Sequence, residues 1–133
     1  MLEVLPIQTK DEQREFCERC GVEFIPDLMA YHAKWGGELI GVCQFTMNSD
    51  GGFIRSMGLV RDKFTSREEF EALFVLGRAT LNFIDLCGVH TAYYTAEDFT
   101  DEKIIHAIGF KKNSDGVYEM SLTDFFKEPC SHH

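Results

Sequence analysis

The first 60 residues combine short apolar segments with the turn residues that separate strands. The predicted strands are residues 2–7, 29–35, 38–47 and 53–60. Gly36-Gly37 accepts the positive φ of a tight hairpin, and residues 48–52 form a second turn. Between the first two strands, residues 11–20 are typical of a helix that ends at Gly21. Three consecutive antiparallel strands therefore follow a strand and a helix.

After Arg61 the apolar pattern lengthens to the period of a helix. Apolar residues share one face of a helix predicted over 67–87, which Gly88 ends. Ser66 and Glu69 at its start have the spacing of a capping box. The remaining predictions are a strand over 89–96, a helix over 101–108, and strands over 110–112 and 117–122. The order β-α-β-β-β-α-β-α-β-β predicts an α/β (α+β) fold with a mixed, mainly antiparallel sheet.

Composition and charge limit the classes of function that the chain can serve. The 133 residues are 44% apolar and 13% aromatic, enough for one packed domain over residues 1–133. The formal charge of −9 disfavours nucleic-acid and membrane-surface partners. No apolar stretch approaches the ~18 residues of a membrane span, and residues 1–6 lack the pattern of a signal peptide. The odd number of cysteines, five, favours reduced thiols and a cytoplasmic location.

Two short motifs within this element order resemble a known family. Residues 37–42 (Gly-Glu-Leu-Ile-Gly-Val) look like the third strand of the GNAT acyltransferases, and residues 107–110 (Ala-Ile-Gly-Phe) look like the x-Leu-Gly-Phe before their sixth strand. The resemblance covers nearly the whole chain. It implies the GNAT fold, in which acetyl-CoA lies in a wedge where the fourth and fifth strands separate.

The resemblance also implies a cofactor-binding segment. Backbone groups of residues 57–60 would hold the pantetheine arm, and the start of the long helix would hold the diphosphate. The family's Arg/Gln-x-x-Gly-x-Gly/Ala loop corresponds here to residues 61–69, which contain no glycine and add negative charge at Glu68 and Glu69. Basic side chains can bind phosphate directly in place of bare backbone. The expected cofactor-binding residues are Gly58, Leu59, Val60, Arg61, Lys63, Ser66 and Arg67.

The catalytic positions that the resemblance implies are altered. The family's asparagine position falls on Asp98, and its tyrosine position falls on Ile105, which cannot donate a proton. Glu97 and Asp98 are the candidate general bases, and Tyr94 is a candidate hydroxyl beside the thioester. The alternative interpretation is that the two carboxylates begin a solvated turn and that the tyrosine belongs to the core.

The sequence therefore leaves three functions open. The first is an N-acyltransferase that uses acetyl-CoA on a small amine or a peptide amine, whose positive charge the acidic surface would attract. The second is a non-catalytic binding or regulatory module that has lost acyl-CoA binding. The third is an interaction protein that forms a homodimer through its C-terminal hairpin.

Cys17-Glu18-Arg19-Cys20 has the spacing of a metal or redox pair. Its only conceivable partners in the sequence are Cys130 and the histidines at 132 and 133. Because the four-residue motif lies within a predicted helix, one cysteine can simply face the core. We expect no metal site.

Overall fold

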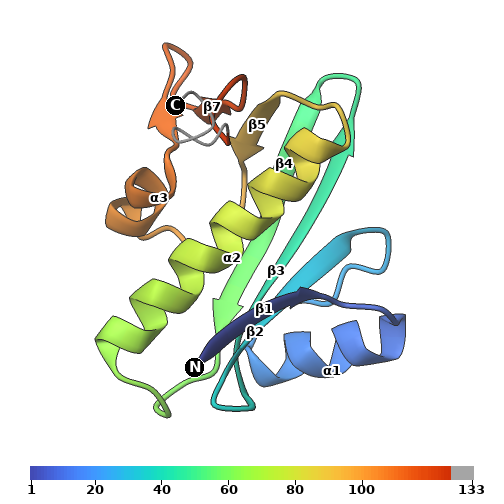
Figure 1. The fold of residues 1–133 in the computed structure, drawn as a ribbon, viewed down its shortest axis with the longest axis vertical. Helices are drawn as coiled ribbons and strands as arrows, with labels where there is room; N and C mark the ends of the chain where they lie inside the picture. The colour runs from blue at the N-terminus through green and yellow to red at the C-terminus, as the bar shows by residue number, and fades with distance from the viewer. Residues whose placement is uncertain (127–133) are drawn as a thin grey trace, which may run out of the picture.

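The computed structural model describes residues 1–126. The elements of this part of the chain follow the predicted order (Figure 1). They are β1 (Leu2–Pro6), α1 (Lys10–Arg19), β2 (Met29–Trp35), β3 (Glu38–Asn48), β4 (Gly51–Leu59), α2 (Ser66–Leu86), β5 (Thr91–Tyr94), α3 (Glu102–Ile108), β6 (Lys111–Lys112) and β7 (Tyr118–Ser121). No helix in residues 1–126 is long and apolar enough to cross a membrane.

All described strands form one sheet, in the order β1-β2-β3-β4-β5-β7-β6. Neighbouring strands are antiparallel except β4 and β5, which pair in parallel. A parallel pair needs a long crossover connection, and α2 provides it. The parallel pairing covers only Gly52–Ile54 of β4, so the rest of β4 continues without β5 beside it (Figure 1).

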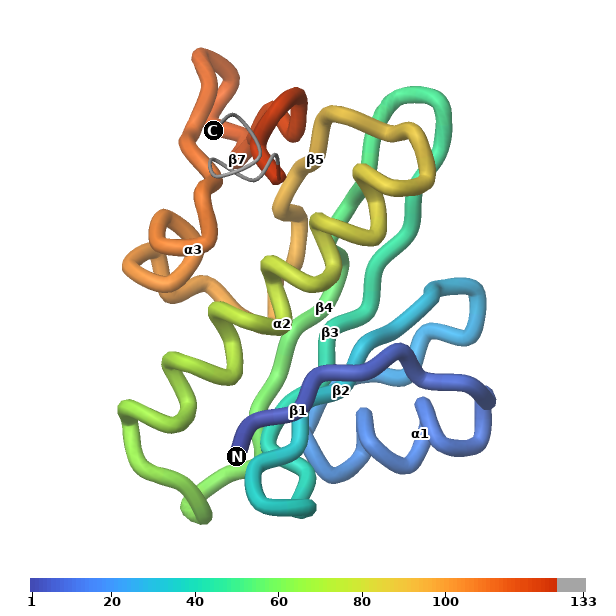
Figure 2. The backbone as a smooth tube through the Cα atoms, viewed as in Figure 1, coloured from blue at the N-terminus to red at the C-terminus, as the bar shows by residue number. Residues whose placement is uncertain are grey.

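The helices α1 and α2 cover opposite faces of the sheet. Phe16 and Cys17 of α1 pack with Val42 of β3 in one apolar cluster. Leu76 and Ile84 of α2 belong to the larger cluster on the other face. Figure 2 shows α2 crossing the central strands diagonally, with α1 beside β1 and β2 at one end of the sheet.

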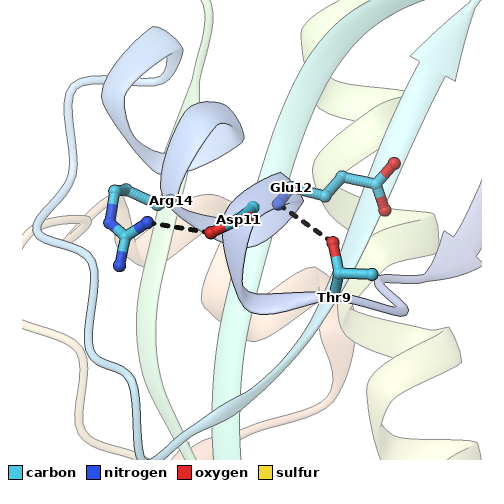
Figure 3. Close-up of polar contacts among 4 residues, drawn as sticks. All are labelled: Thr9, Asp11, Glu12 and Arg14. Carbon is cyan, nitrogen blue, oxygen red and sulfur yellow. Dashed lines mark hydrogen bonds and ion pairs between the residues drawn. The ribbon is translucent and has the colours of Figure 1, made fainter.

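The start of α1 is fixed by a local cap. The Thr9 hydroxyl oxygen accepts a hydrogen bond from the backbone N–H of Glu12 at 3.1 Å. Within the first turn, Arg14 forms an exposed ion pair with Asp11 at 3.1 Å (Figure 3). These contacts satisfy one of the free N–H groups that a helix start leaves and set the point at which β1 turns into α1.

The start of α2 differs by one residue from the sequence prediction. Thr65, not Ser66, is the N-cap: its side chain accepts from the backbone N–H of Glu68, and the Glu68 side chain accepts from the backbone N–H of Thr65. The predicted Ser66–Glu69 box is therefore wrong. Both pairs have the spacing of a capping box, so the pattern alone could not distinguish them.

Candidate functional site

A pocket of about 310 Å³ opens where β4 and β5 part. Its walls come from the end of α1, the unpaired part of β4, the loop into α2 and the segment after β5. The lining residues are Cys20, Gly21, Val22, Met57, Gly58, Leu59, Val60, Arg61, Asp62, Glu69, Asp98 and Phe99. We call this pocket the wedge. It is the place where the sequence resemblance located the cofactor.

The backbone of β4 presents hydrogen-bonding groups to the wedge. The N–H of Val60 donates to the carbonyl of Ile40 in β3 at 2.9 Å. Because successive residues of a strand turn their N–H groups to opposite sides, those of Met57 and Leu59 face away from β3 and toward the wedge. With β5 absent at this level, β4 has the free edge of an unpaired strand.

A β-bulge lies in β4 immediately before this free edge. Gln44 of β3 pairs with Ser56, whereas the next residue, Phe45, pairs with Ile54, so Arg55 is the extra residue. A bulge bends the strand and increases its twist. It therefore helps to direct β4 away from β5 at the level where the wedge begins.

Of the three candidate catalytic residues, Asp98 alone lines the wedge. One carboxylate oxygen accepts from the Met57 N–H at 3.1 Å, and the other accepts from the buried Ser56 hydroxyl at 2.6 Å. These bonds join the segment after β5 to β4 across the gap. Glu97 is exposed and does not line the pocket, although it is the next residue along the chain.

Tyr94 lies in the core rather than in the wedge. Its side chain is buried, its ring packs edge-on against Phe110, and its hydroxyl donates to the carbonyl of Phe99 at 2.6 Å. Burial raises the pKa of Tyr94 far above its ordinary value. This geometry matches the alternative interpretation of Tyr94 as a core residue whose hydroxyl is satisfied.

The basic candidates are distributed unevenly around the wedge. Arg61 lines it, whereas Lys63 lies outside the lining and forms an ion pair with Glu38 at 3.2 Å. Ser66 and Arg67 are exposed in the first turn of α2 and are not lining residues either. Gly58, Leu59 and Val60 all line the wedge as the sequence indicated. The structure therefore brings the β4 candidates together with only one of the three basic side chains.

The loop after β4 makes its turn without glycine. Asp62 has a φ of 59°, in the left-handed region that aspartate tolerates better than most residues. Asp62 and Glu69 both line the wedge. The mouth of the pocket thus has two carboxylates near one guanidinium.

Sequence reasoning did not identify the contribution of α1 to the wedge. The end of α1 packs so closely on β4 that a Cβ at Gly58 would lie 2.5 Å from Cγ1 of Val22 and 3.0 Å from the Cys20 carbonyl oxygen. A glycine inside a strand often marks such an approach of another segment. Gly58, a glycine within a predicted strand, was therefore the one feature of the sequence that could have indicated the contribution of α1 to the wedge.

The other positions with possible chemistry lie elsewhere. Ile105, at the family's tyrosine position, is 1% exposed and belongs to the core. Cys17 and Cys20 are buried free thiols, and burial raises the pKa of Cys20 to about 12. No group of three or more metal-ligand side chains occurs within residues 1–126. The conceivable partner Cys130 and the two terminal histidines lie outside the described residues.

Comparison with solved structures places this arrangement among known folds. The ribosomal-protein-S18-alanine N-acetyltransferase from Escherichia coli superposes with a TM-score of 0.64 at 10% identity, over 92% of this chain and 94% of that chain. The PaiA N-acetyltransferase from Thermoplasma acidophilum, in complex with coenzyme A, gives 0.63 at 9% identity over 91% and 99%. A Bacillus subtilis acetyltransferase in complex with CoA gives 0.60 at 15% identity over 86% and 79%.

No model of a protein family matches the sequence, and a search of curated proteins finds no match. The structural likeness extends over nearly the full length of this chain, and the order of helices and strands is the one that the sequence resemblance implied. The chain therefore has the GNAT fold.

Proposed function

We propose that the protein is an acyl-CoA-dependent N-acyltransferase and that the wedge is its cofactor site. The observation that carries the proposal is the edge of β4 without β5, where the Leu59 N–H faces a pocket beside the start of α2 and the Met57 N–H faces it while bonded to Asp98. An extended pantetheine arm carries amides that can bond to such an edge. Structural neighbours whose solved structures contain CoA support this assignment.

The residues of the wedge fit an acyl-CoA only in part. The β4 edge suits the pantetheine amides, and Arg61 can bind one phosphate. Asp62 and Glu69 would repel the diphosphate, so Arg61 alone would have to offset two carboxylates. We therefore expect acyl-CoA to bind with moderate affinity, and we expect this affinity to depend strongly on Arg61.

The proposed reaction needs few protein groups. Acetyl-CoA held along β4 and at Arg61 would supply an activated acyl group. Attack by the acceptor amine would form the C–N bond, break the C–S bond and release the CoA thiol. Asp98, through a water molecule, holds the proton that the amine gives up. Glu97, exposed at the same turn, is the second candidate for this role.

Asp98 also supports the competing function, a binding or regulatory module without catalysis. Its carboxylate already accepts a hydrogen bond from the Met57 N–H, one of the two backbone donors of β4 that face the wedge. Acyl-CoA must either use Leu59 alone or displace Asp98. A protein in which Asp98 permanently joined the strands would keep the fold and lose the cofactor.

Isothermal titration of acetyl-CoA and free CoA tests the proposal. We expect micromolar binding to the unchanged protein and about tenfold weaker binding to Arg61→Ala, the size of one charged hydrogen bond to phosphate. Arg14→Ala removes the same charge from the outer surface of α1 and should leave the affinity unchanged. Absence of binding at millimolar cofactor would rule out the acyltransferase and favour the regulatory module.

If the cofactor binds, amine-acceptor assays with Asp98→Asn and Glu97→Gln separate the two candidate bases. We expect Asp98→Asn to lower kcat, because the amide keeps the size of the side chain but cannot take the proton. Glu97→Gln tests the second candidate base and should change kcat less. The reverse pattern would assign the role to Glu97.

A further inference from the structure

A second pocket, of about 230 Å³, lies away from the wedge and shares no lining residue with it. It lies where the turn between β1 and α1 approaches the start of β2 and the last third of α2. The side chains that matter are Ile7, Lys10, Met29, Tyr31, Phe45 and Phe83. The turn between β1 and α1 is far from α2 in the sequence, as the colours of Figure 2 show, and both line this pocket, so tertiary folding creates it.

Three aromatic rings form one wall of this second pocket. Tyr31 and Phe45 are stacked, with ring centroids 5.9 Å apart and planes 24° apart. Phe83 meets Tyr31 at 6.2 Å and Phe45 at 5.9 Å, edge-on in both cases. The wall is thus a cluster of packed aromatic side chains, an apolar surface against which another aromatic ring can pack.

Lys10 is exposed and is the single charged residue among the described residues of the lining, and part-buried hydrogen bonds hold its ammonium in place. The ammonium donates to the Leu28 carbonyl at 2.6 Å and to the side-chain oxygen of Gln13 at 3.0 Å. Gln13 is 2% exposed and in turn donates to Gln44 at 2.8 Å. An ammonium has three N–H donors, so one remains for a ligand.

The other polar side chains that the structure describes in the lining are neutral, so Lys10 sets the charge of the occupant. The Thr9 hydroxyl oxygen is engaged by the Glu12 N–H, and both side-chain atoms of Gln13 are already bonded. A cationic ligand would meet the Lys10 ammonium with no carboxylate in the lining to offset it. The volume lies below the ~300–1,000 Å³ of drug-sized pockets, which limits the occupant to one or two rings.

We propose that this second pocket binds a small aromatic carboxylate, with its ring against Tyr31, Phe45 and Phe83 and its carboxylate on Lys10. The aromatic wall provides the apolar contact, and the fixed ammonium selects the sign of the charge. The site is independent of the proposed acyltransferase function, because no residue belongs to both pockets.

Titration of the protein with phenylacetate and indole-3-acetate, followed by two-dimensional amide NMR, tests the proposal. We expect shifts at Ile7, Met29 and Ala30 and none at Leu59 in the wedge. 2-Phenylethylamine has the same ring with the opposite charge and should not bind. Equal binding of the amine and the acid, or no shift at millimolar acid, would overturn the proposal.

Three variants locate the contacts. Lys10→Gln should weaken phenylacetate binding about tenfold, the effect of one charge-assisted bond. Lys103→Gln, a matched change of an exposed lysine in α3, should have no effect. Because Lys10 also bonds to Leu28, Phe83→Leu gives a second test that keeps that network, and it too should weaken binding. Unchanged affinity in Lys10→Gln and Phe83→Leu, with thermal unfolding showing both folded, would contradict the assignment.

Discussion

At the scale of single residues, His32 lies in a buried environment that its position in the sequence did not predict. It lies in β2 on the face covered by α1, 6% exposed, with its ring 5.0 Å from that of Phe16. Its Nδ1 atom is buried without a hydrogen-bond partner among the described residues. Burial lowers the pKa of His32, and Lys34 adds to this effect, while Glu12 and Glu3 act in the opposite direction. His32 is therefore harder to protonate in the folded protein than in the unfolded chain.

The burial of His32 predicts that the free energy of unfolding depends on pH. The unfolded chain protonates His32 near pH ~6.5, whereas the folded protein protonates it only at lower pH. As the pH falls below ~6.5, the unfolded state takes up a proton that the folded state does not, and the free energy of unfolding decreases. Urea unfolding at intervals from pH 8 to pH 5 measures this slope.

His32→Leu provides the comparison, since it fills the site with an apolar side chain and removes the titrating group. The difference in unfolding free energy between His32→Leu and the unchanged protein should grow as the pH falls through this range. A constant difference would show that His32 is not responsible for the slope.

The candidate catalytic residues show how far sequence can predict single side chains. The position of Asp98 shortly after β5 followed from the element order, and so did its approach to the wedge. Its bonds to Ser56 and Met57 join residues more than 40 positions apart and could not be predicted from local pattern. Tyr94 and Tyr93 alternate along β5, but which of them faces the core depends on the neighbouring strands.

At the scale of elements, the start of α2 matters because it borders the wedge. Thr65 and Glu68 bond to each other's backbone N–H groups there, whereas Ser66 is exposed within the first turn. The two neighbouring hydroxyl residues therefore have different roles in the structure. A pair of alanine substitutions distinguishes the cap that forms from the cap that the pattern suggested.

We expect Thr65→Ala to lower the free energy of unfolding by about 1 kcal/mol, because it leaves a helix N–H group without its cap. Ser66→Ala should change it by less than ~0.5 kcal/mol, as is usual for exposed positions. Urea unfolding of both variants under one condition makes the comparison. Equal losses, or a larger loss in Ser66→Ala, would contradict the observed cap.

The separation of β4 from β5 also belongs to this scale. The sequence predicted both strands, yet β5 is shorter than the segment 89–96 that its apolar residues suggested. The parallel pairing ends after Ile54 and Tyr94, next to the bulge at Arg55. Strand propensity does not contain this information, since a bulge is defined by the register of two strands rather than by one of them.

At the scale of the whole molecule, the formal charge of −9 acts on any charged ligand that approaches. Screening by salt shortens the range of this field to about 8 Å at physiological ionic strength. An anionic cofactor is repelled before it meets the local cation Arg61, whereas a cationic amine is attracted. The two substrates of the proposed reaction should therefore respond to salt in opposite directions.

Stopped-flow association kinetics across a range of ionic strength measure this response. Added salt should raise the association rate of acetyl-CoA and lower that of a cationic amine acceptor. A neutral analogue of the acceptor is the control and should show little change. A decrease of the acetyl-CoA rate with salt would mean that the local field of Arg61 outweighs the net charge.

The sequence by itself determined the order and type of the elements, because apolar period, turn glycines and helix stops are properties of neighbouring residues. It also determined the resemblance to the GNAT fold, which depends on that order. Only the tertiary structure decided which backbone N–H groups of β4 face the wedge and that the Asp98 carboxylate accepts from one of them. It also placed Lys10 beside an aromatic wall in the second pocket. These features arise between residues distant in the chain, where register and packing set the contacts and local pattern does not.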